Sequence, residues 1–520
     1  MSMQIVTVEQ MREMEAVAGR DYGLTPQILM ESAGKSAAEL LAREARKHRA
    51  VSGQEFVLLI GPGNNGGDGL VMARHLEQWG GLVSLYHWKE QRLTVHGEEV
   101  PAWQTARRLE AMIQSASYIV DALLGTGRSR PLPDEMRALL HRVREEREKR
   151  GTLRIVAVDL PTGLNADTGE VDPGTIAADL TITLACPKQG FFFFPGRDYL
   201  GQLLIGSIGL PQALEHVCPN EMLTDTLIRH LLPVRPMESN KGTFGKVMLL
   251  CGSPSYPGSA YLAGKAAARI GAGLITLAVS EQMLPVYASA FHEATFVILP
   301  PEEEHSLKRV DLLMEAMQGY RCLLVGPGLG QSPSTREQIL HLLERLRALP
   351  DEHRPRLVVD ADGLNNLSAL EHWWTLLPRE SVITPHPGEM GRLCHGIQVS
   401  GGSLARLELA RQKAREWQVT LVLKGACTIV THADPAASLR TRINWKANPA
   451  MATAGTGDVL AGMIAGLLAQ GVAPFDAASA AVYLHASAGE LVSQQIGKAG
   501  LLASDLLAEI PRTLPGLSQG

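Results

Sequence analysis

Short hydrophobic runs alternate with helical patterns of hydrophobic positions along nearly the whole chain. An apolar run at residues 56–60 is followed by a glycine-rich segment, a helical pattern over 70–79 and a second apolar run at 82–87. Such alternation is typical of a mostly parallel sheet that is covered by helices. The pattern therefore predicts an α/β protein.

Local signals indicate where several elements begin. Thr7 and Gln10 fit a capping box at the start of the first helix, and Thr25 followed by Pro26 fits an N-cap with proline in the first turn. The four phenylalanines at 191–194 are expected to pack in a core or an interface.

The chain is expected to fold as two domains. Its 520 residues exceed what one compact domain usually holds. Four prolines punctuate the segment 209–242, after which a new apolar run begins at Lys246. We place the two domains at residues 1–220 and 225–518.

Composition and charge exclude several classes of protein. Hydrophobic residues make up 45%, charged residues 20%, and the net charge is −5, which is too weak to draw the chain onto nucleic acid or an anionic membrane. None of the six cysteines forms a CxxC pair, so neither a zinc site nor a disulfide framework is expected. The first residues lack the apolar core of a signal peptide, and no later stretch has the length of a membrane span, so we expect a cytoplasmic protein.

In the first half, a glycine-rich motif indicates an anion site. Residues 61–69 read GPGNNGGDG between a predicted strand and a predicted helix. Glycines let the backbone approach a ligand, and a helix N-terminus offers unpaired N–H groups to a phosphate. Asp68 stands where a Walker loop has lysine, and the amides of Asn64 and Asn65 also suit a sugar or a nicotinamide amide. A plain turn is the alternative interpretation.

Two aspartates, Asp121 and Asp159, lie at the ends of later predicted strands. Because the carboxyl ends of parallel strands line the ligand crevice of an open α/β sheet, we expect both to converge with Asn64, Asn65 and Asp68. For each aspartate a cap or turn role is the alternative. Carboxylate, carbonyl and amide oxygens together suit a monovalent or a divalent cation, and the spacing does not choose between the two.

Five motifs of the first half together resemble a known family. They are LMESAG at 29–34, GPGNNGGDG at 61–69, DALLGTG at 121–127, DLPTGL at 159–164 and CPKQG at 186–190. The set is similar to the N-terminal domain of bifunctional NAD(P)H-hydrate repair enzymes, the YjeF-type epimerases. The resemblance implies a Rossmann-like three-layer domain that interconverts the R and S hydrates of NADH and NADPH. It implies that the hydrate is bound by Asn64, Asn65, Gly66, Gly67, Asp68, Gly125, Thr126, Gly127, Arg128, Ser129, Arg130, Pro131 and Asp159.

The same resemblance implies a potassium ion held by Asn65, Asp121 and Thr162. Thr162 stands where the family often has serine. Inverting a carbon that carries a hydroxyl beside a ring nitrogen requires a proton to be removed and returned, and Asp159 is our candidate acid or base. Lys188 either assists Asp159 or is a solvated lysine at a strand end.

A second glycine-rich motif precedes a predicted helix in the second half. Residues 454–462 read AGTGDVLAG, which places Gly455 and Gly457 where their N–H groups can bind an anion, and Asp458 in the first helical turn. A carboxylate beside a phosphate is unfavourable unless it has a chemical task. We infer that Asp458 accepts the proton of a substrate hydroxyl that attacks a terminal phosphoryl group. An N-cap role is the alternative.

Other candidate ligands follow predicted strands. Lys424 can bind a phosphate, and Gly425 lets a nucleotide approach the backbone. His386 lies between two prolines and therefore in an extended loop, either as a ligand contact or as an ordinary loop histidine. Asp360 and Asp362 either orient a cation or cap the following helix.

Seven motifs of the second half resemble the ribokinase-like superfamily. They are NKGTFG at 240–245, CGSPSYPG at 251–258, RIGAGL at 269–274, GPGLG at 326–330, TPHPGE at 384–389, KGACT at 424–428 and NPAMATAGTGDVLAG at 448–462. Within it they are similar to the ADP- or ATP-dependent NAD(P)H-hydrate dehydratases. This implies a ribokinase-like three-layer domain in which the hydrate contacts Ser259, Gly328, His386 and Asp458. It also implies that ADP, with Mg²⁺, is held by Lys424, Gly425, Ala426, Cys427, Thr428 and Gly457.

The combined expectation is repair of hydrated nicotinamide coenzymes. Phosphoryl transfer from ADP to the hydroxyl of the S hydrate, followed by elimination, would restore NAD(P)H and release AMP and phosphate, while the epimerase recycles the R hydrate. A small-molecule kinase joined to a nicotinamide-binding regulator and a non-catalytic nucleotide sensor are the alternatives. We expect NAD(P)H hydrates and ADP as ligands, a homo-oligomer, and no nucleic-acid or membrane partner.

Overall fold

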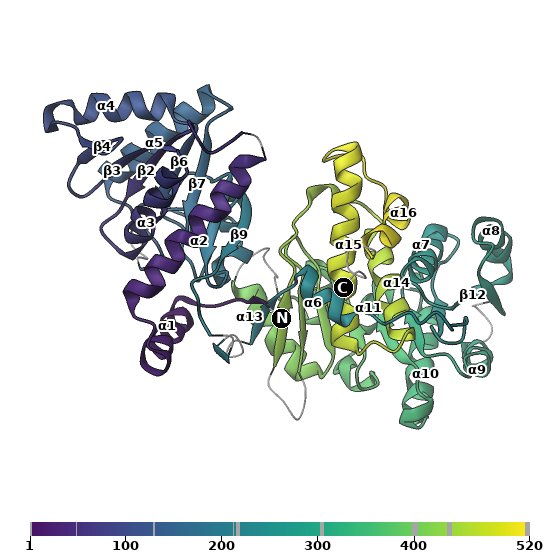
Figure 1. Ribbon diagram of the computed structural model, residues 1–520. Coiled ribbons are helices and arrows are strands. Elements are labelled where there is room, and N and C mark those ends of the chain that lie inside the picture. Colours follow the sequence, from purple (N-terminus) through teal and green to yellow (C-terminus); the bar gives the residue numbers. More distant parts are fainter. Residues whose placement is uncertain are drawn as a thin grey trace. The chain divides into compact units, whose positions relative to one another are not determined.

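The computed structural model describes residues 3–47, 49–127, 131–211, 213–214, 219–301, 306–397, 404–433 and 439–514. The chain divides into two compact units (Figure 1). One holds Met3–Cys218, and the other holds Pro219–Gly401 together with Ala405–Gly520. Each unit has its own sheet covered by helices, so the predicted α/β class is confirmed.

The first unit is built on a sheet with the strand order β5-β4-β3-β2-β6-β7-β8-β9. The strands are β2 (Glu55–Ile60), β3 (Leu82–His87), β4 (Arg92–Val95), β5 (Glu98–Glu99), β6 (Tyr118–Ala122), β7 (Arg154–Val158), β8 (Leu180–Leu184) and β9 (Gln202–Gly206). Neighbouring strands are parallel except that β4 is antiparallel to β3 and to β5. The strand order reverses at β2, and such a reversal is where open α/β sheets bind ligands.

Helices cover both faces of this sheet. After the two-residue strand β1 (Met3–Gln4) they are α1 (Val8–Tyr22), α2 (Pro26–Arg46), α3 (Asn64–Gln78), α4 (Ala102–Ser115) and α5 (Asp134–Lys149). Because side chains alternate along a strand, Phe56 and Leu58 pack with α1, α2 and α3, whereas Val57 and Leu59 pack with α4 and α5. The unit therefore has three layers (Figure 1).

The second unit has a sheet with the strand order β10-β19-β18-β17-β16-β15-β14-β11-β12-β13. The strands are β10 (Asn220–Met222), β11 (Lys246–Leu250), β12 (Leu274–Ser280), β13 (Thr295–Leu299), β14 (Cys322–Val325), β15 (Arg356–Val359), β16 (Val382–Ile383), β17 (Thr420–Leu423), β18 (Ile429–His432) and β19 (Arg440–Ile443). All of these neighbours are parallel except β18, which is antiparallel to both β17 and β19.

Helices also cover this sheet. They are α6 (Asp225–Leu231), α7 (Pro257–Arg269), α8 (Leu284–Ala290), α9 (Ser306–Ala316), α10 (Pro333–Ala348), α11 (Asp362–Leu367), α12 (Pro387–Leu393), α13 (Leu404–Trp417), α14 (Thr456–Ala469), α15 (Pro474–Ile496) and α16 (Ala503–Thr513). Helices α7, α14, α15 and α16 share one large core with the strands, and α9 and α10 lie on the opposite side (Figure 1). Within the described residues, we find no helix with the length and hydropathy of a membrane span.

Several local predictions are confirmed. Thr7 and Gln10 form the capping box of α1, and Thr25 caps α2. Of the four phenylalanines, Phe191, Phe192 and Phe193 are buried in the first unit, and Phe194 is partly buried. The glycine-rich segment differs from the prediction, because α3 begins at Asn64 and most of the motif lies inside the helix.

The alternation along β2 leads to a stability prediction. Leu58→Ala removes a fully buried side chain and is expected to lower the free energy of unfolding by about 2–5 kcal/mol through lost burial and a cavity. Leu82→Ala, at the exposed start of the neighbouring strand, is the matched control and is expected to change it by about 0.5 kcal/mol or less. Urea unfolding of both variants measures this, and equal losses would contradict the packing described for β2.

Candidate active sites

The glycines of the first motif allow close backbone packing around the start of α3. A Cβ atom on Gly61 would lie 1.7 Å from the carbonyl oxygen of Leu123, and one on Gly66 would lie 2.0 Å from the carbonyl oxygen of Gly61. A Cβ on Gly63, the N-cap of α3, would meet no atom within 4 Å. No side chain caps α3, so its first N–H groups have no side-chain acceptor among the described residues. The end of β2 thus presents these groups beside open space.

A cavity of about 700 Å³ lies at this end of the first unit. Its polar lining includes Glu15, Asn65, Asp68, Thr126, Asp159 and Lys188. Asn64, Gly125 and Gly127 line it as well. The side-chain amide of Asn65 is buried, and neither its nitrogen nor its oxygen has a hydrogen-bond partner in the described structure. Because buried amides are normally satisfied, Asn65 fits a site that a ligand or a cation completes.

Asp159 and Lys188 form a buried ion pair in this cavity. Lys188 is only 1% exposed, and its ammonium donates to Asp159 Oδ1, to the Thr183 hydroxyl at 2.9 Å and to the Leu184 carbonyl at 3.0 Å. The alternative of a solvated Lys188 is therefore wrong, because the chain after β8 folds back over the end of β7. The other oxygen, Asp159 Oδ2, lies 3.4 Å from where a Cβ on Gly125 would be. The ion pair fixes one oxygen of Asp159 and leaves the other toward the glycine loop.

Two further carboxyl groups line the same cavity. Burial, reinforced by the negative charges of Asp159 and Glu15, raises the pKa of Asp68 to about 8. Burial also raises the pKa of Glu15, and the charge of Lys188 partly opposes this. At neutral pH the Asp68 carboxyl group therefore carries a proton, while Asp159 is the carboxylate of an ion pair.

Asp121 and Thr162 are joined behind this cavity. Thr162 donates to Asp121 through its hydroxyl at 2.7 Å and through its backbone N–H at 2.8 Å, and the Leu123 N–H donates to Asp121 at 3.2 Å. Burial raises the pKa of Asp121 in spite of these bonds. Carboxylate, hydroxyl and amide oxygens are hard donors of the kind that monovalent and divalent cations prefer. Among the described residues, no cluster of three or more His, Cys, Asp or Glu could hold a metal.

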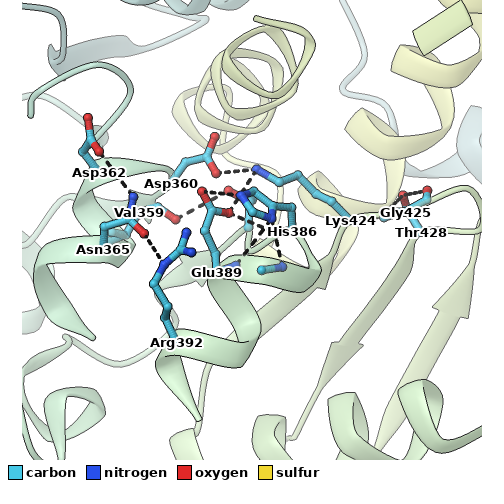
Figure 2. Close-up of polar contacts among 12 residues, drawn as sticks. Val359, Asp360, Asp362, Asn365, His386, Glu389, Arg392, Lys424, Gly425 and Thr428 are labelled. Atoms are coloured by element: carbon cyan, nitrogen blue, oxygen red, sulfur yellow. Dashed lines mark hydrogen bonds and ion pairs between the residues drawn. The ribbon is translucent and has the colours of Figure 1, made fainter. Parts of the chain in front are cut away.

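In the second unit, a partly buried lysine links two buried carboxylates that follow different strands (Figure 2). Lys424 Nζ donates to Asp360 Oδ1 at 2.7 Å and lies 3.7 Å from Glu389 Oε2. Although burial works against it, the negative charges of Asp360, Glu389 and Asp458 raise the pKa of Lys424. Asp360 therefore serves the ion pair and not the helix cap, since the N-cap position of α11 is Ala361 and has no side-chain cap hydrogen bond.

His386 is the N-cap of α12 and has an extended backbone, as its two flanking prolines predicted. Its ring atom Nδ1 accepts hydrogen bonds from the backbone N–H groups of Gly388 at 3.0 Å and Glu389 at 3.4 Å. The backbone N–H of His386 donates to Glu389 Oε2 at 2.8 Å. Burial and the charges of Lys424 and Arg392 lower the pKa of His386. The ring is therefore neutral at physiological pH, with Nδ1 as acceptor and Nε2–H as a donor.

Asp458 lies in the first turn of α14, as predicted. Burial and the negative charge of Asp360 raise its pKa to about 6, and a hydrogen bond from Ser259 partly opposes this. A Cβ on Gly457 would lie 3.4 Å from Lys424 Nζ, and one on Gly328 would lie 2.8 Å from Ser259 Oγ. The structure thus brings five of the residues predicted to bind hydrate or ADP to one site, namely Ser259, Gly328, Lys424, Gly457 and Asp458.

Asp362 does not cap α11, which was one of its two predicted roles. Its side chain accepts hydrogen bonds from the Gly330 N–H at 2.9 Å and from the Gln331 amide at 2.9 Å. It therefore holds the GPGLG loop after β14. Asn365, one turn later, accepts from Arg392 at 2.9 Å and ties α11 to α12 (Figure 2).

Some of the residues predicted to bind the hydrate are not placed in the cavity of the first unit. Gly67 packs against Met30, where a Cβ would lie 2.5 Å from the sulfur atom, and Pro131 is exposed. Arg128, Ser129 and Arg130 lie outside the described residues. Glu389 was not predicted as a functional residue, although it stands in the TPHPGE motif three positions after His386, the spacing of a capping box.

Comparison with known proteins places this chain in a family. Residues 26–190 match the family described as YjeF-related protein N-terminus, and residues 247–512 match the family described as NAD(P)H-hydrate dehydratase. The chain is 35% identical to the bifunctional NAD(P)H-hydrate repair enzyme of Moorella thermoacetica, an alignment that covers 99% of this chain and 98% of that protein. The chain belongs to the family of bifunctional NAD(P)H-hydrate repair enzymes. Both resemblances drawn from the motifs are confirmed.

One further relative and one solved structure are also similar to this chain. The bifunctional NAD(P)H-hydrate repair enzyme of Salinibacter ruber is 33% identical, with 98% of this chain and 95% of that protein covered. The solved ADP/ATP-dependent NAD(P)H-hydrate dehydratase from Bacillus subtilis, co-crystallised with ATP and Mg²⁺, is 31% identical with a TM-score of 0.47. It covers 57% of this chain and 98% of its own.

The ion pair of Lys424 leads to a prediction about stability and pH. Lys424→Met leaves Asp360 and Glu389 without their cation, and we expect a loss of about 3–5 kcal/mol at pH 7. Because burial already raises the pKa of Glu389, its carboxyl group binds more protons when folded than when unfolded, so the loss of stability should shrink as the pH falls toward 4 and Glu389 becomes neutral. Urea unfolding at pH 7 and pH 4.5 measures this difference.

Arg345→Met is the control for this experiment, because it removes a cation from the exposed pair with Asp311 in the same unit. We expect a change of about 1 kcal/mol or less. A loss for Lys424→Met that is independent of pH would show that the lysine acts through packing and not through its charge.

Proposed function

We propose that the first unit epimerises the R and S hydrates of NADH and NADPH and that the second unit dehydrates the S hydrate with ADP. The proposal rests on one observation. Each unit places an ion pair between a lysine and a buried aspartate, and a second aspartate of raised pKa, at the carboxyl end of its parallel sheet, beside glycine-lined backbone. Family membership over the full chain supports the substrates. We keep residues 1–220 and 225–518 as the two domains.

In the first unit, epimerisation requires the bond between carbon and hydroxyl to break and to form again on the opposite face. The departing hydroxyl needs a proton, and the returning water must lose one. We assign the proton donor to Asp68, whose pKa of about 8 keeps it protonated near neutral pH. We assign the acceptor to Asp159 Oδ2, because Lys188 occupies Oδ1. Two carboxyl groups with different protonation states in one cavity are suited to this exchange.

The anion and cation sites of the first unit support binding of the dinucleotide. The uncapped start of α3 offers N–H groups to a phosphate of the hydrate. Asn65, Asp121 and Thr162 would hold a potassium ion, and their single carboxylate suits a monovalent charge. When bound, the ion would offset the buried charge of Asp121 and fix the loops that follow β2, β6 and β7.

In the second unit, Asp458 would take the proton of the hydrate's hydroxyl as that oxygen attacks the terminal phosphoryl group of ADP. The new oxygen–phosphorus bond replaces the bond to AMP, which leaves. Loss of a proton from the neighbouring carbon then expels phosphate and restores the reduced nicotinamide. Lys424 and the N–H groups at the start of α14 would stabilise the phosphoryl charge, with Mg²⁺ entering as part of the nucleotide complex.

Single substitutions in the full chain separate the two activities. With mixed hydrate epimers and ADP, Asp458→Asn is expected to lower dehydration by about 10²–10⁴-fold and to leave epimerisation unchanged. Asp159→Asn is expected to abolish epimerisation, so that only the S hydrate is consumed and the R hydrate remains. Chromatography of the two epimers with a phosphate assay measures both. A stable phosphorylated hydrate in place of free phosphate would favour a kinase, and unchanged rates would favour a sensor.

The two activities are also expected to depend on pH in opposite ways. Asp458 must be deprotonated to accept a proton, so kcat/KM for dehydration should rise as the pH increases through about 6. Asp68 must be protonated to donate, so kcat/KM for epimerisation should fall as the pH increases through about 8. Asp68→Asn is expected to remove that fall. An epimerase profile that stays flat from pH 7 to pH 9 would exclude Asp68 as the donor.

A further inference from the structure

A buried arginine lies behind the loop that joins β17 to β18. Arg406, on α13, is 4% exposed. Its Nη2 donates to the carbonyl oxygens of Leu423 at 2.7 Å and Lys424 at 2.6 Å, and its Nη1 donates to that of Cys427 at 3.1 Å. One guanidinium group therefore bonds to both ends of the loop 424–428.

The partners of this guanidinium group are neutral carbonyl oxygens and not carboxylates. Burial without a close opposite charge disfavours the charged form and lowers the pKa of Arg406 to about 10. A buried charge of this kind reduces stability unless its hydrogen bonds compensate. The hairpin does not need it for closure, because β17 and β18 already pair over four residues and Thr428 Oγ1 donates to the Gly425 carbonyl at 3.0 Å.

The bonds to Arg406 fix the orientation of the loop's peptide groups. A trans peptide group is planar and its C=O and N–H point in opposite directions, so the N–H groups of Lys424, Gly425 and Thr428 point away from the arginine. The Lys424 N–H accordingly donates to the Pro385 carbonyl at 2.9 Å, in the loop that carries His386. Arg406 thereby connects the orientation of the loop 424–428 to the neighbouring site loop.

Gly425 gives independent support. A Cβ at this position would lie 2.5 Å from Arg406 Nη2 and 2.8 Å from Cζ. The sequence suggested that this glycine lets a nucleotide approach, but its Cβ side is filled by the guanidinium group. The glycine therefore allows Arg406 to lie flat against the loop, and the nucleotide must approach from the other side.

We propose that Arg406 is the positioning residue of the ADP site, which holds the loop 424–428 so that the Thr428 N–H and the Lys424 ammonium meet the diphosphate, while the Lys424 and Gly425 N–H groups bond within the protein. The assignment rests on the proposed binding of ADP to this loop. Arg406 does not touch the nucleotide, and it acts through the backbone of Lys424 and Gly425. Because a lysine offers a single charged point and no planar fork, it cannot replace all three hydrogen bonds.

The test uses the full-length protein and isothermal titration with ADP and Mg²⁺. Arg406→Met is expected to raise the Kd and the KM for ADP at least tenfold, Arg406→Lys is expected to recover part of this, and epimerisation should be unchanged in both. Arg415→Met, an exposed arginine on the same helix, is the matched control and should leave ADP binding unchanged. If both Arg406 variants unfold at a lower temperature than the wild type but bind ADP as tightly as the wild type at temperatures well below their melting temperatures, Arg406 has only a structural role and the proposal fails.

A double-mutant cycle of Arg406 with Gly425 and the variant Lys424→Met complete the test. Gly425→Ala should weaken ADP binding in the wild type, and much less in Arg406→Met, because its Cβ would collide with the guanidinium group; additive losses would overturn the proposal. Lys424→Met distinguishes a failure of the role of Arg406 from a failure of the nucleotide site itself. If it weakens ADP binding while Arg406→Met does not, only the role of Arg406 fails. If it leaves ADP binding unchanged, the proposed nucleotide site itself fails.

Discussion

An ion pair between a lysine and a buried aspartate at the carboxyl end of a parallel sheet is the constraint on which each proposed site depends. Lys188 pairs with Asp159 in the first unit, and Lys424 pairs with Asp360 in the second. Removing both charges from water is costly, and it is repaid only when geometry and further hydrogen bonds are good. The Thr183 hydroxyl and the Leu184 carbonyl meet this need for Lys188. Each ion pair therefore holds together the two chain segments that carry its lysine and its aspartate.

The paired carboxylates also determine the behaviour of their unpaired neighbours. Asp68 lies in the same cavity as Asp159, and Asp458 lies close to Asp360, so the negative charge of each pair's aspartate helps to raise the pKa of the neighbour. A group of ordinary pKa near 4 would be ionised throughout the physiological range and could not donate a proton. In both units, burial provides the larger part of the shift and the fixed carboxylate provides the next part. This arrangement separates a carboxylate held in an ion pair from a titrating group.

The sequence predicted the sheets and the positions of their functional ends better than it predicted charged contacts. The run at β2 and the acids near the ends of β6 and β7 follow from periodicity, because a buried parallel strand and its carboxyl end have a local signature. The burial of Lys188 and of Arg406 has no such signature. Both are long charged side chains whose partners come from other segments, and only the folded chain brings carbonyl and carboxylate oxygens to them. Local charge patterns indicate a solvated residue in such cases.

Glycine-rich motifs are the part of the sequence in which ligand contact and internal packing are hardest to separate. A Cβ on Gly61 or Gly66 would lie within 2.5 Å of backbone atoms, so the fold itself requires these two glycines, and a Cβ on Gly425 would lie 2.5 Å from the Arg406 guanidinium group. A Cβ on Gly63 or Gly127 would meet nothing within 4 Å, and both glycines line the cavity of the first unit. Ligand approach therefore explains only the second group. In the first group the absent side chain allows two backbones, or a backbone and the Arg406 guanidinium, to come into contact, and that contact aims the N–H groups that a phosphate would meet.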